Sequence, residues 1–250
     1  TTTREDFDLV FSVAAGNAIR VADIDAGTND VQVELTAVNG TLTLDPGFTI
    51  PGTFFTFTSD TNGTTAGDGT NDSVMRFRGT LGAINNALDG LVFTPTLNHV
   101  GTATITVTIN DLGNSGAEMP VVPRVDSDSV TVTVTAENDA PTVTAPGSFT
   151  VNEDGSLSIS NANANQVLVD DVDLGAGKLL VSLSVGDGVL TLKRITGLTF
   201  VTGDGTDDSS MSFTGSRSAV NAAIDGLLYV PTAGLNGPDS TGLVVTIDDQ

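Results

Sequence analysis

Cysteine and tryptophan are absent from this sequence of 250 residues, which contains one tyrosine and one histidine. Without cysteine, neither disulfide bonds nor thiolate metal sites can form. His99 is the single histidine, so Ser-His-Asp and Cys-His arrangements have only this residue to work with, and a zinc site of the usual histidine and cysteine kind lacks ligands. Carboxylates for glycoside hydrolysis are plentiful, but aromatic residues, which form sugar platforms, make up only 5% of the chain. We therefore expect a protein that is not an enzyme.

Basic residues are also scarce, because nine lysines and arginines stand against 31 aspartates and glutamates, for a formal net charge of −22. A field of this sign repels phosphate backbones and anionic membranes, so we expect no nucleic-acid partner and no direct membrane contact. No apolar run reaches the roughly 18 residues that a membrane-spanning helix needs. Several acids fall in short clusters, which makes divalent cations natural counter-ions. The alternative is a solvated acidic surface.

The sequence does contain an internal repeat of domain size. Four segments of the first half return in the same order in the second: 21–27 as 169–175, 40–44 as 188–192, 67–73 as 203–209, and 83–96 as 219–232. Tandem repeats usually act through length and surface. Since domains commonly span about 100–150 residues, the repeat predicts two domains, 1–139 and 140–250. The proline in the linker Asn138-Asp139-Ala140-Pro141 favours a short, stiff connection.

Short strands are predicted throughout both halves. In 103–109 and 129–135, β-branched apolar residues alternate with threonine, which places one strand face on a core and the other in water. Similar segments lie at 31–37, 41–44, 74–78 and 91–94, with counterparts at 179–185, 189–193, 210–214 and 227–230. Many short antiparallel strands with one wet face are typical of a sandwich of two sheets. The predicted fold class is all-β, with two tandem immunoglobulin-like β-sandwich domains.

One segment of each half has helical spacing instead. Apolar residues fall at Leu81, Ile84, Leu88 and Leu91 in the first half and at Val220, Ile224 and Leu227 in the second. Thr80 and Ser216 are suitable N-caps, and Gly90 is a suitable end. Each sandwich is therefore predicted to carry one short helix. Asn85 and Asn221 recur in these helices, and we predict that they stabilise a turn or cap an end rather than bind a ligand.

The two halves differ at two places. The first half carries about a dozen extra residues within 46–65, which we expect to form a longer hairpin or a surface loop. The second half ends at 246–250, which matches 108–112, so the final strand, the counterpart of 129–135, is absent. One explanation is that the sequence is a stretch of a longer protein, which also accounts for the lack of a signal peptide. The other is an open sheet edge that pairs with another chain, giving a homo-oligomer or filament.

Acidic residues recur at matching positions of the two halves. Each half has a Glu-Asp pair, at 5–6 and 153–154, and then an Asp-x-Asp, at 23–25 and 171–173. An Asn-Asp-x-Pro segment, 138–141, joins the halves. This order resembles that of cadherin-type repeats, and more closely that of the bacterial cadherin-like tandem repeat domains of large surface adhesins, over essentially the whole chain. The resemblance implies cadherin-like sandwiches and an extracellular location, either on a bacterial cell surface or secreted.

In cadherins, calcium (Ca2+) binds at the joint between successive domains, and calcium takes six to eight oxygens at about 2.3–2.6 Å. The resemblance implies that the joint in this chain uses Glu5, Asn138, Asp139, Asp171 and Asp173. It also implies that Asp23 and Asp25 serve the joint to a preceding domain and that Glu153 serves the joint to a following one. The Asp-Arg-Glu segment of vertebrate cadherins is not recognisable, and the linker lacks the first Asp and the final Asn of the fuller cadherin linker. We therefore expect one or two ions. Without tryptophan, the strand-swapped adhesion of vertebrate cadherins is not implied.

Two further sets of acids have more than one interpretation. The loops 67–72 and 203–208 are either turns closed by aspartate side chains or calcium loops, although they lack the final glutamate of the twelve-residue calcium loop. The pairs Asn110-Asp111 and Asp248-Asp249 are either turn formers at strand ends or additional ligands.

The predicted function is structural. We expect a calcium-stiffened adhesive repeat of a bacterial cell-surface or secreted adhesin that acts as an extended spacer, with the neighbouring repeats of the same protein as its partners. One alternative is a subunit of a surface fibre that assembles through edge-strand pairing. The other is a calcium-dependent carbohydrate-binding module, which the scarcity of aromatic residues disfavours.

Overall fold

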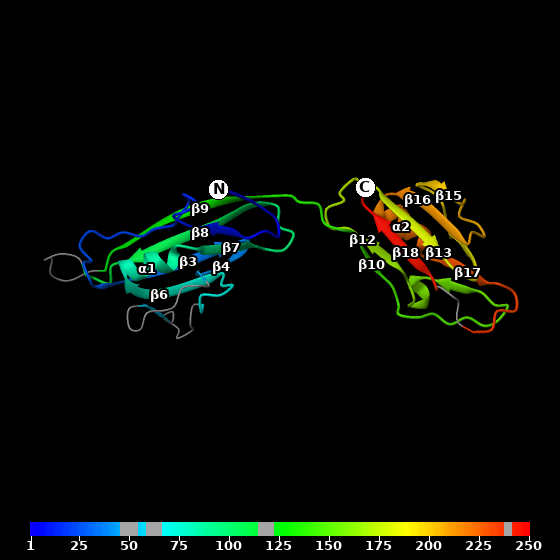
Figure 1. The fold of residues 1–250 in the computed structure, drawn as a ribbon, viewed down its shortest axis with the longest axis horizontal. Coiled ribbons are helices and arrows are strands. Elements are labelled where there is room, and N and C mark those ends of the chain that lie inside the picture. Colours follow the sequence, from blue (N-terminus) through cyan, green and yellow to red (C-terminus); the bar gives the residue numbers. More distant parts are fainter. Residues whose placement is uncertain (46–54, 59–66, 115–122, 238–241) are drawn as a thin grey trace. The chain divides into compact units, whose positions relative to one another are not determined.

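The computed structural model describes residues 1–250 except 46–54, 59–66, 115–122 and 238–241 (Figure 1). The chain forms two compact units, Thr1–Glu137 and Asn138–Gln250. Both units consist mainly of short antiparallel strands arranged in several sheets, and each has one short α-helix, so the predicted all-β sandwich class is confirmed. Among the described helices, neither is long and apolar enough to cross a membrane.

The first unit packs a six-stranded sheet against a three-stranded sheet around one apolar core. The large sheet has the order β1-β9-β8-β3-β6-β5, and the small sheet has the order β2-β7-β4. Neighbouring strands are antiparallel except β1 and β9, which are parallel. The elements are β1 (Thr2–Arg4), β2 (Leu9–Phe11), β3 (Asp30–Val38), β4 (Gly40–Thr43), β5 (Phe55–Phe57), β6 (Val74–Thr80), α1 (Leu81–Leu88), β7 (Leu91–Pro95), β8 (Gly101–Asn110) and β9 (Val125–Thr135).

The second unit repeats this plan around a core of its own. A four-stranded sheet of order β15-β16-β13-β18 lies against a three-stranded sheet of order β11-β17-β14, and β10 and β12 form a separate antiparallel pair. The elements are β10 (Thr142–Thr144), β11 (Leu157–Ile159), a 3-10 helix (Asn161–Asn163), β12 (Leu168–Asp170), β13 (Leu179–Ser184), β14 (Gly188–Thr191), β15 (Leu198–Thr202), β16 (Ser210–Gly215), α2 (Arg217–Ile224), β17 (Leu227–Pro231) and β18 (Val244–Asp248).

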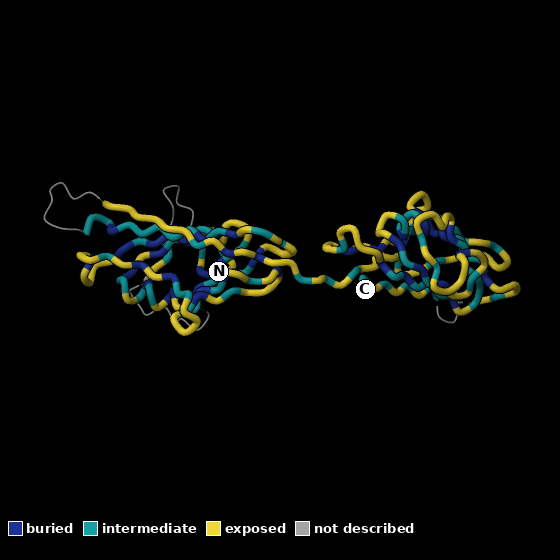
Figure 2. The backbone as a smooth tube through the Cα atoms, turned by 90° about the horizontal axis from the view of Figure 1, so that it is seen from above, coloured by how far each residue is buried: buried dark blue, intermediate teal, exposed yellow. Residues whose placement is uncertain are grey.

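Alternation along the strands separates each core from solvent, as Figure 2 shows for the described residues. In β3, Val31, Val33 and Leu35 are fully buried, whereas Gln32 and Glu34 between them are only half-buried. Every strand predicted from alternation is present. The strands that sequence reasoning did not predict are mostly three residues long, which is too short for a period of two to stand out.

Both helices begin at the predicted caps, and a glycine lies two residues after the last helical residue of each. The hydroxyl oxygens of Thr80 and Ser216 accept hydrogen bonds from the backbone N–H three residues further on, at 3.4 and 3.3 Å. Each helix is followed by an aspartate and then by Gly90 or Gly226, with φ of 106° and 104°. Only glycine adopts this backbone region without strain. The N–H groups of these glycines donate to carbonyls of the small sheets at 2.9 and 2.8 Å, which fastens each helix end to its sandwich.

The two units differ at the edges of their sheets. In the first unit, β9 lies between β8 and β1, and no described strand of the second unit takes the equivalent place beside β18. In the second unit, β10 pairs with β12, whereas residues 20–22, the counterpart of β12, are not a strand. Of the predicted hairpin or loop at 46–65, the structure describes 55–58, where β5 pairs with β6. The remainder of that prediction lies outside the described residues.

Candidate functional site

The acidic pair of each unit follows a stretch of backbone that is held by an asparagine of the helix. In the second unit, Oδ1 of Asn221 accepts from the N–H of Val169 at 2.9 Å, and its Nδ2 donates to the carbonyl of the same residue at 2.8 Å. In the first unit, Asn85 makes the same two bonds to Val21, at 3.0 and 2.9 Å. The recurrent asparagines therefore clamp the chain two residues before each Asp-x-Asp, instead of taking the predicted turn or capping role.

The first aspartate of each pair folds the chain around its own carboxylate. Oδ1 of Asp171 accepts from two backbone N–H groups, of Asp173 at 3.2 Å and of Leu174 at 2.8 Å. Oδ1 of Asp23 accepts from the two equivalent N–H groups, both at 3.1 Å. Turns of this kind are typical of aspartate. As a result, the two carboxyl groups of each pair lie close enough to interact with each other.

Burial and mutual repulsion act on these carboxyl groups. Asp171 is 4% exposed, and its Oδ2 has no hydrogen-bond partner in the described structure. Burial, followed by the neighbouring Asp173 carboxyl, raises the pKa of Asp171 above its ordinary value. In the first unit, the Asp23 carboxyl raises the pKa of Asp25, with a smaller contribution from the charge of Asp111. A bound cation would relieve the repulsion in both pairs.

Two residues of the linker segment lie against the acidic groups of the second unit. The N–H of Asp139 donates to Oδ2 of Asp173 at 3.1 Å. Nδ2 of Asn138 donates to Oδ2 of Asp249 at 2.6 Å. The structure thus places Asp139 next to the Asp-x-Asp, and it places Asn138 on Asp249, a residue whose role the sequence left open.

Asp111 is the counterpart of Asp249 in the first unit, and it closes a turn after β8. It is 6% exposed. Its Oδ1 accepts from the N–H groups of Gly113 at 2.9 Å and Arg124 at 2.6 Å. Its negative charge also acts on Asp25. Asp111 is therefore a turn former that also lies close to the acidic pair.

An arginine beside the second acidic pair was missed by sequence reasoning. Nη1 of Arg217, the first residue of α2, donates to Oδ1 of Asp170 at 2.5 Å and to the carbonyl of Asp171 at 3.2 Å. The N–H of Asp171, followed by the guanidinium of Arg217, holds the pKa of Asp170 below its ordinary value. The first half of the sequence has Ala22 and Leu81 at the two positions, so the repeat carried no signal for this contact.

The two glutamates predicted as calcium ligands lie in different surroundings. Glu5 is 2% exposed, and its Oε1 accepts from the N–H of Glu137 at 2.9 Å. It follows β1, and its own N–H donates to the carbonyl of Thr135, the last residue of β9, at 2.8 Å. Glu153 is exposed, and its Oε1 accepts from Nδ2 of Asn236 at 3.5 Å. The difference follows from the sheets, because no described strand in the second unit takes the place of β9.

The described residues form acidic pairs rather than a complete cage. Within the described ranges, no group of three or more histidine, aspartate or glutamate side chains is arranged to hold a metal ion. Asp171 with Asp173, and Asp23 with Asp25, are each a pair. Since calcium takes six to eight oxygens, a shell around either pair also needs amide oxygens, backbone carbonyls or water.

The two Gly-Asp loops are closed by their own aspartates. In the second unit, Oδ2 of Asp208 accepts from the N–H groups of Asp204 and Gly205 at 3.1 and 2.8 Å. In the first unit, Asp72 makes the same two bonds at 2.9 and 2.7 Å. The N–H of Thr206 adds a bond to Oδ1 of Asp204 at 3.0 Å. These contacts are those of a turn, the first of the two interpretations.

Replacing Asp208 with alanine should lower the free energy of unfolding of the second unit by about 1–2 kcal/mol, because two backbone N–H groups lose their acceptor. Tyr229 is the only tyrosine and the chain has no tryptophan, so tyrosine fluorescence during urea unfolding reports on this unit. Thr206→Ala, at an exposed position of the same loop, is the control and should change stability by less than about 0.5 kcal/mol. Equal stabilities of Asp208→Ala and the control would contradict the turn role.

No family model and no curated protein matches this sequence. Among solved structures, the chain is similar to the C-terminal domain of the Streptococcus pyogenes antigen I/II-family protein AspA, at 10% sequence identity and a TM-score of 0.24. That comparison covers 95% of this chain and 90% of the other. At this identity and TM-score, the similarity gives no information on ligands, partners or site residues.

Proposed function

We propose that this chain is a calcium-binding structural module of a cell-surface or secreted adhesin and that it acts as an extended spacer. The observation that carries the proposal is Asp171, whose buried carboxylate has one oxygen without a hydrogen-bond partner next to a second carboxylate. Burying a charge is costly unless it is paired. The arrangement is therefore better suited to a bound cation than to an acidic surface that only faces water.

The donor set fits calcium. Calcium prefers carboxylate, amide and backbone carbonyl oxygens. The second unit offers Asp171 and Asp173, with Asp139 in contact with Asp173 and Asn138 in contact with Asp249. Calcium would supply two positive charges to a group of acids in which burial, followed by the neighbouring Asp173 carboxyl, raises the pKa of Asp171. Glu5, the Asp23–Asp25 pair and Glu153 remain predicted ligands on the resemblance alone.

The contacts of the linker residues support the proposed stiffening role. In the first unit, the buried carboxylate of Glu5 accepts from the N–H of Glu137. In the second unit, the carboxylate of Asp173 accepts from the N–H of Asp139. A cation bound by Asp171 and Asp173 would fix the side chain that holds Asp139, and would thereby restrict the backbone of the linker. Without a cation, the repulsion between the carboxylates opposes this restriction of the linker backbone.

Small-angle scattering of the full chain, with matched thermal melts, tests the proposal. We expect millimolar calcium to raise Tm and to narrow the distribution of distances within the chain, compared with the same chain in chelator at equal ionic strength. Magnesium is the matched control, because it demands a near-octahedral shell of short bonds and should have a smaller effect. If calcium changes neither Tm nor the scattering, the acids are solvated surface and the proposal is wrong.

A further inference from the structure

Arg217 brings a positive charge to the acidic pair of the second unit. It is the first residue of α2, and its Nη1 donates to Oδ1 of Asp170 at 2.5 Å and to the carbonyl of Asp171 at 3.2 Å. The second contact attaches the guanidinium to a residue whose own carboxylate is buried and has one oxygen without a hydrogen-bond partner in the described structure. The charge of Arg217 is therefore held beside the carboxylate that carries the proposed function.

The fold of the second unit does not depend on a positive charge at this position. The side chains of Arg217 and Asp170 are 53% and 68% exposed, and ion pairs this exposed contribute little to stability because water and salt screen them. Each helix is eight residues long and is capped by the hydroxyl of the preceding residue, whether its first residue is Arg217 or Leu81. The charge of Arg217 thus calls for an explanation other than the formation of α2.

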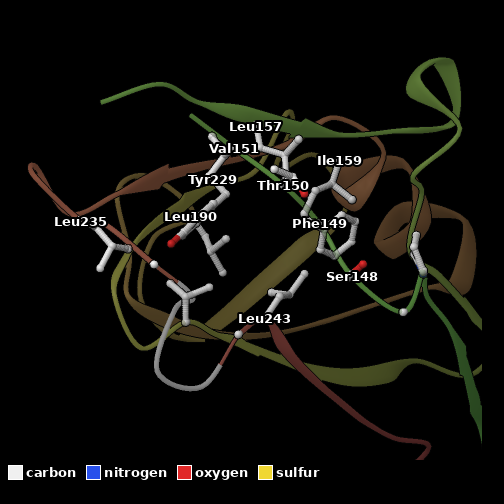
Figure 3. A pocket seen from close by; sticks show the side chains of 15 residues that line it. Ser148, Phe149, Thr150, Val151, Leu157, Ile159, Leu190, Tyr229, Leu235 and Leu243 are labelled. Carbon is white, nitrogen blue, oxygen red and sulfur yellow. The ribbon is translucent and has the colours of Figure 1, made fainter. Parts of the chain in front are cut away.

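The cavity of the second unit is not a place where a cation would bind. It has a volume of about 420 Å³, and its lining, which includes Phe149, Leu190 and Tyr229, contains no aspartate, glutamate, lysine or arginine (Figure 3). At the acidic pair, by contrast, burial, followed by the neighbouring Asp173 carboxyl, raises the pKa of Asp171. The charge of Arg217 therefore acts where a cation would have the most to neutralise.

The guanidinium acts on the acids in two ways. The N–H of Asp171, followed by Arg217, holds the pKa of Asp170 below its ordinary value, so Asp170 stays ionised and paired. The same positive charge repels a cation that approaches Asp171 and Asp173, and a divalent ion experiences twice the repulsion of a monovalent one. Over a distance of about one residue, salt screens this repulsion only in part, since the Debye length is about 8 Å at physiological ionic strength.

We propose that Arg217 is a built-in counter-ion that lowers the calcium affinity of the Asp171–Asp173 pair, an inference that rests on the proposed function. Without calcium, the guanidinium supplies part of the positive charge that these acids need, and it keeps the carboxylate of Asp170 paired with itself. Calcium binds against this charge, so the pair fills only at a higher calcium concentration. Arg217 thereby sets the concentration at which the second unit responds to calcium.

Melting of the full chain over a series of calcium concentrations tests the role of Arg217. Tyrosine fluorescence reports on the second unit, because Tyr229 is the only tyrosine, and the rise of Tm with calcium gives the Kd. Arg217→Leu introduces the residue that the first half has at this position. We expect it to lower Tm in chelator, since Asp170 and the carbonyl of Asp171 lose a partner, and yet to lower the Kd for calcium at least threefold. A residue with a purely structural role would lower Tm and leave the Kd unchanged.

Two further variants separate the charge of Arg217 from its shape and from the net charge of the chain. Arg217→Lys keeps the positive charge and should keep the Kd of the wild type. Arg194→Leu removes the same charge from an exposed loop residue, whose neighbour Lys193 donates its N–H to the carbonyl of Ala223 near the other end of α2, and it should also leave the Kd unchanged. The difference between the wild type and Arg217→Leu should shrink as the salt concentration rises.

The possible results distinguish the counter-ion from the proposed function. If calcium raises Tm in none of the variants, the proposed function and the counter-ion are both wrong. If calcium raises Tm in Arg217→Leu alone, the counter-ion is supported and the proposed function of the natural chain is wrong. If the wild type responds and Arg217→Leu binds calcium equally or more weakly, the counter-ion alone is overturned. It is also overturned if Arg194→Leu or Arg217→Lys lowers the Kd as much as Arg217→Leu does.

Discussion

Replacing Asn221 with alanine should lower the free energy of unfolding of the second unit by about 2–6 kcal/mol. The side chain of Asn221 satisfies both the N–H and the carbonyl of Val169, a residue that is 1% exposed. Alanine leaves two buried backbone groups without these partners, at about 1–3 kcal/mol for each. Urea unfolding followed by the fluorescence of Tyr229 measures the effect, and the first-unit variant Asn85→Ala should leave that signal unchanged.

Two further variants separate the clamp from a general effect on the helix. Asn221→Asp keeps the acceptor for the N–H of Val169 but loses the donor to its carbonyl, so its stability should fall between those of the wild type and the alanine variant. Ser218→Ala alters an exposed residue of the same helix and should change stability by less than about 0.5 kcal/mol. A similar loss in Ser218→Ala and Asn221→Ala would show that helix propensity, and not the clamp, is responsible.

The clamp also shows how far the repeat predicts structure. The recurrence of Asn85 and Asn221 marks these positions in the sequence, and the spacing of apolar residues predicts the helices that carry them. The partner of each asparagine could not be predicted, since it is the backbone of a valine 64 residues away in the first unit and 52 away in the second. Backbone groups leave no signature in composition or periodicity.

The acidic residues likewise have features that the sequence predicts and features that it does not. Matching positions in the two halves identified both Asp-x-Asp pairs, and local turn chemistry is enough to bring the carboxylates of each pair together. The burial of Glu5 and the exposure of Glu153 could not be predicted, because they depend on whether a distant strand, β9, lies beside the segment. The ion pair of Arg217 with Asp170 occurs in one half alone, so comparison of the halves could not reveal it.

Replacing Asp171 with asparagine should stabilise the second unit in chelator at pH 7, by about 1–3 kcal/mol, because it removes a buried charge whose second oxygen has no partner. The amide retains an oxygen for the N–H groups of Asp173 and Leu174. The pKa of Asp171 is raised in the fold, so ionisation costs stability at every pH above that pKa. As the pH falls through the raised pKa toward the ordinary value of 3.8, the wild type takes up a proton and the cost disappears. The advantage of the variant should therefore shrink on acidification.

Calcium should reverse the order of stability of the wild type and Asp171→Asn. A ligand at one hundred times its Kd stabilises the folded state by about 2.7 kcal/mol, and the wild type should gain this amount whereas Asp171→Asn gains little. The variant is then the more stable protein in chelator and the less stable one in calcium. Asp207→Asn is the matched control, since it removes an exposed acid at a position where the first half already has Asn71, and it should leave the calcium gain intact. If Asp171 were needed only for packing, its replacement would lower the stability of the second unit both in chelator and in calcium. If Asp171 were a solvated surface acid, its replacement would leave the stability unchanged under both conditions. Parallel calcium responses in wild type and Asp171→Asn would therefore exclude Asp171 as a ligand, whereas a crossing of the two stabilities is the result that metal binding by a buried carboxylate requires.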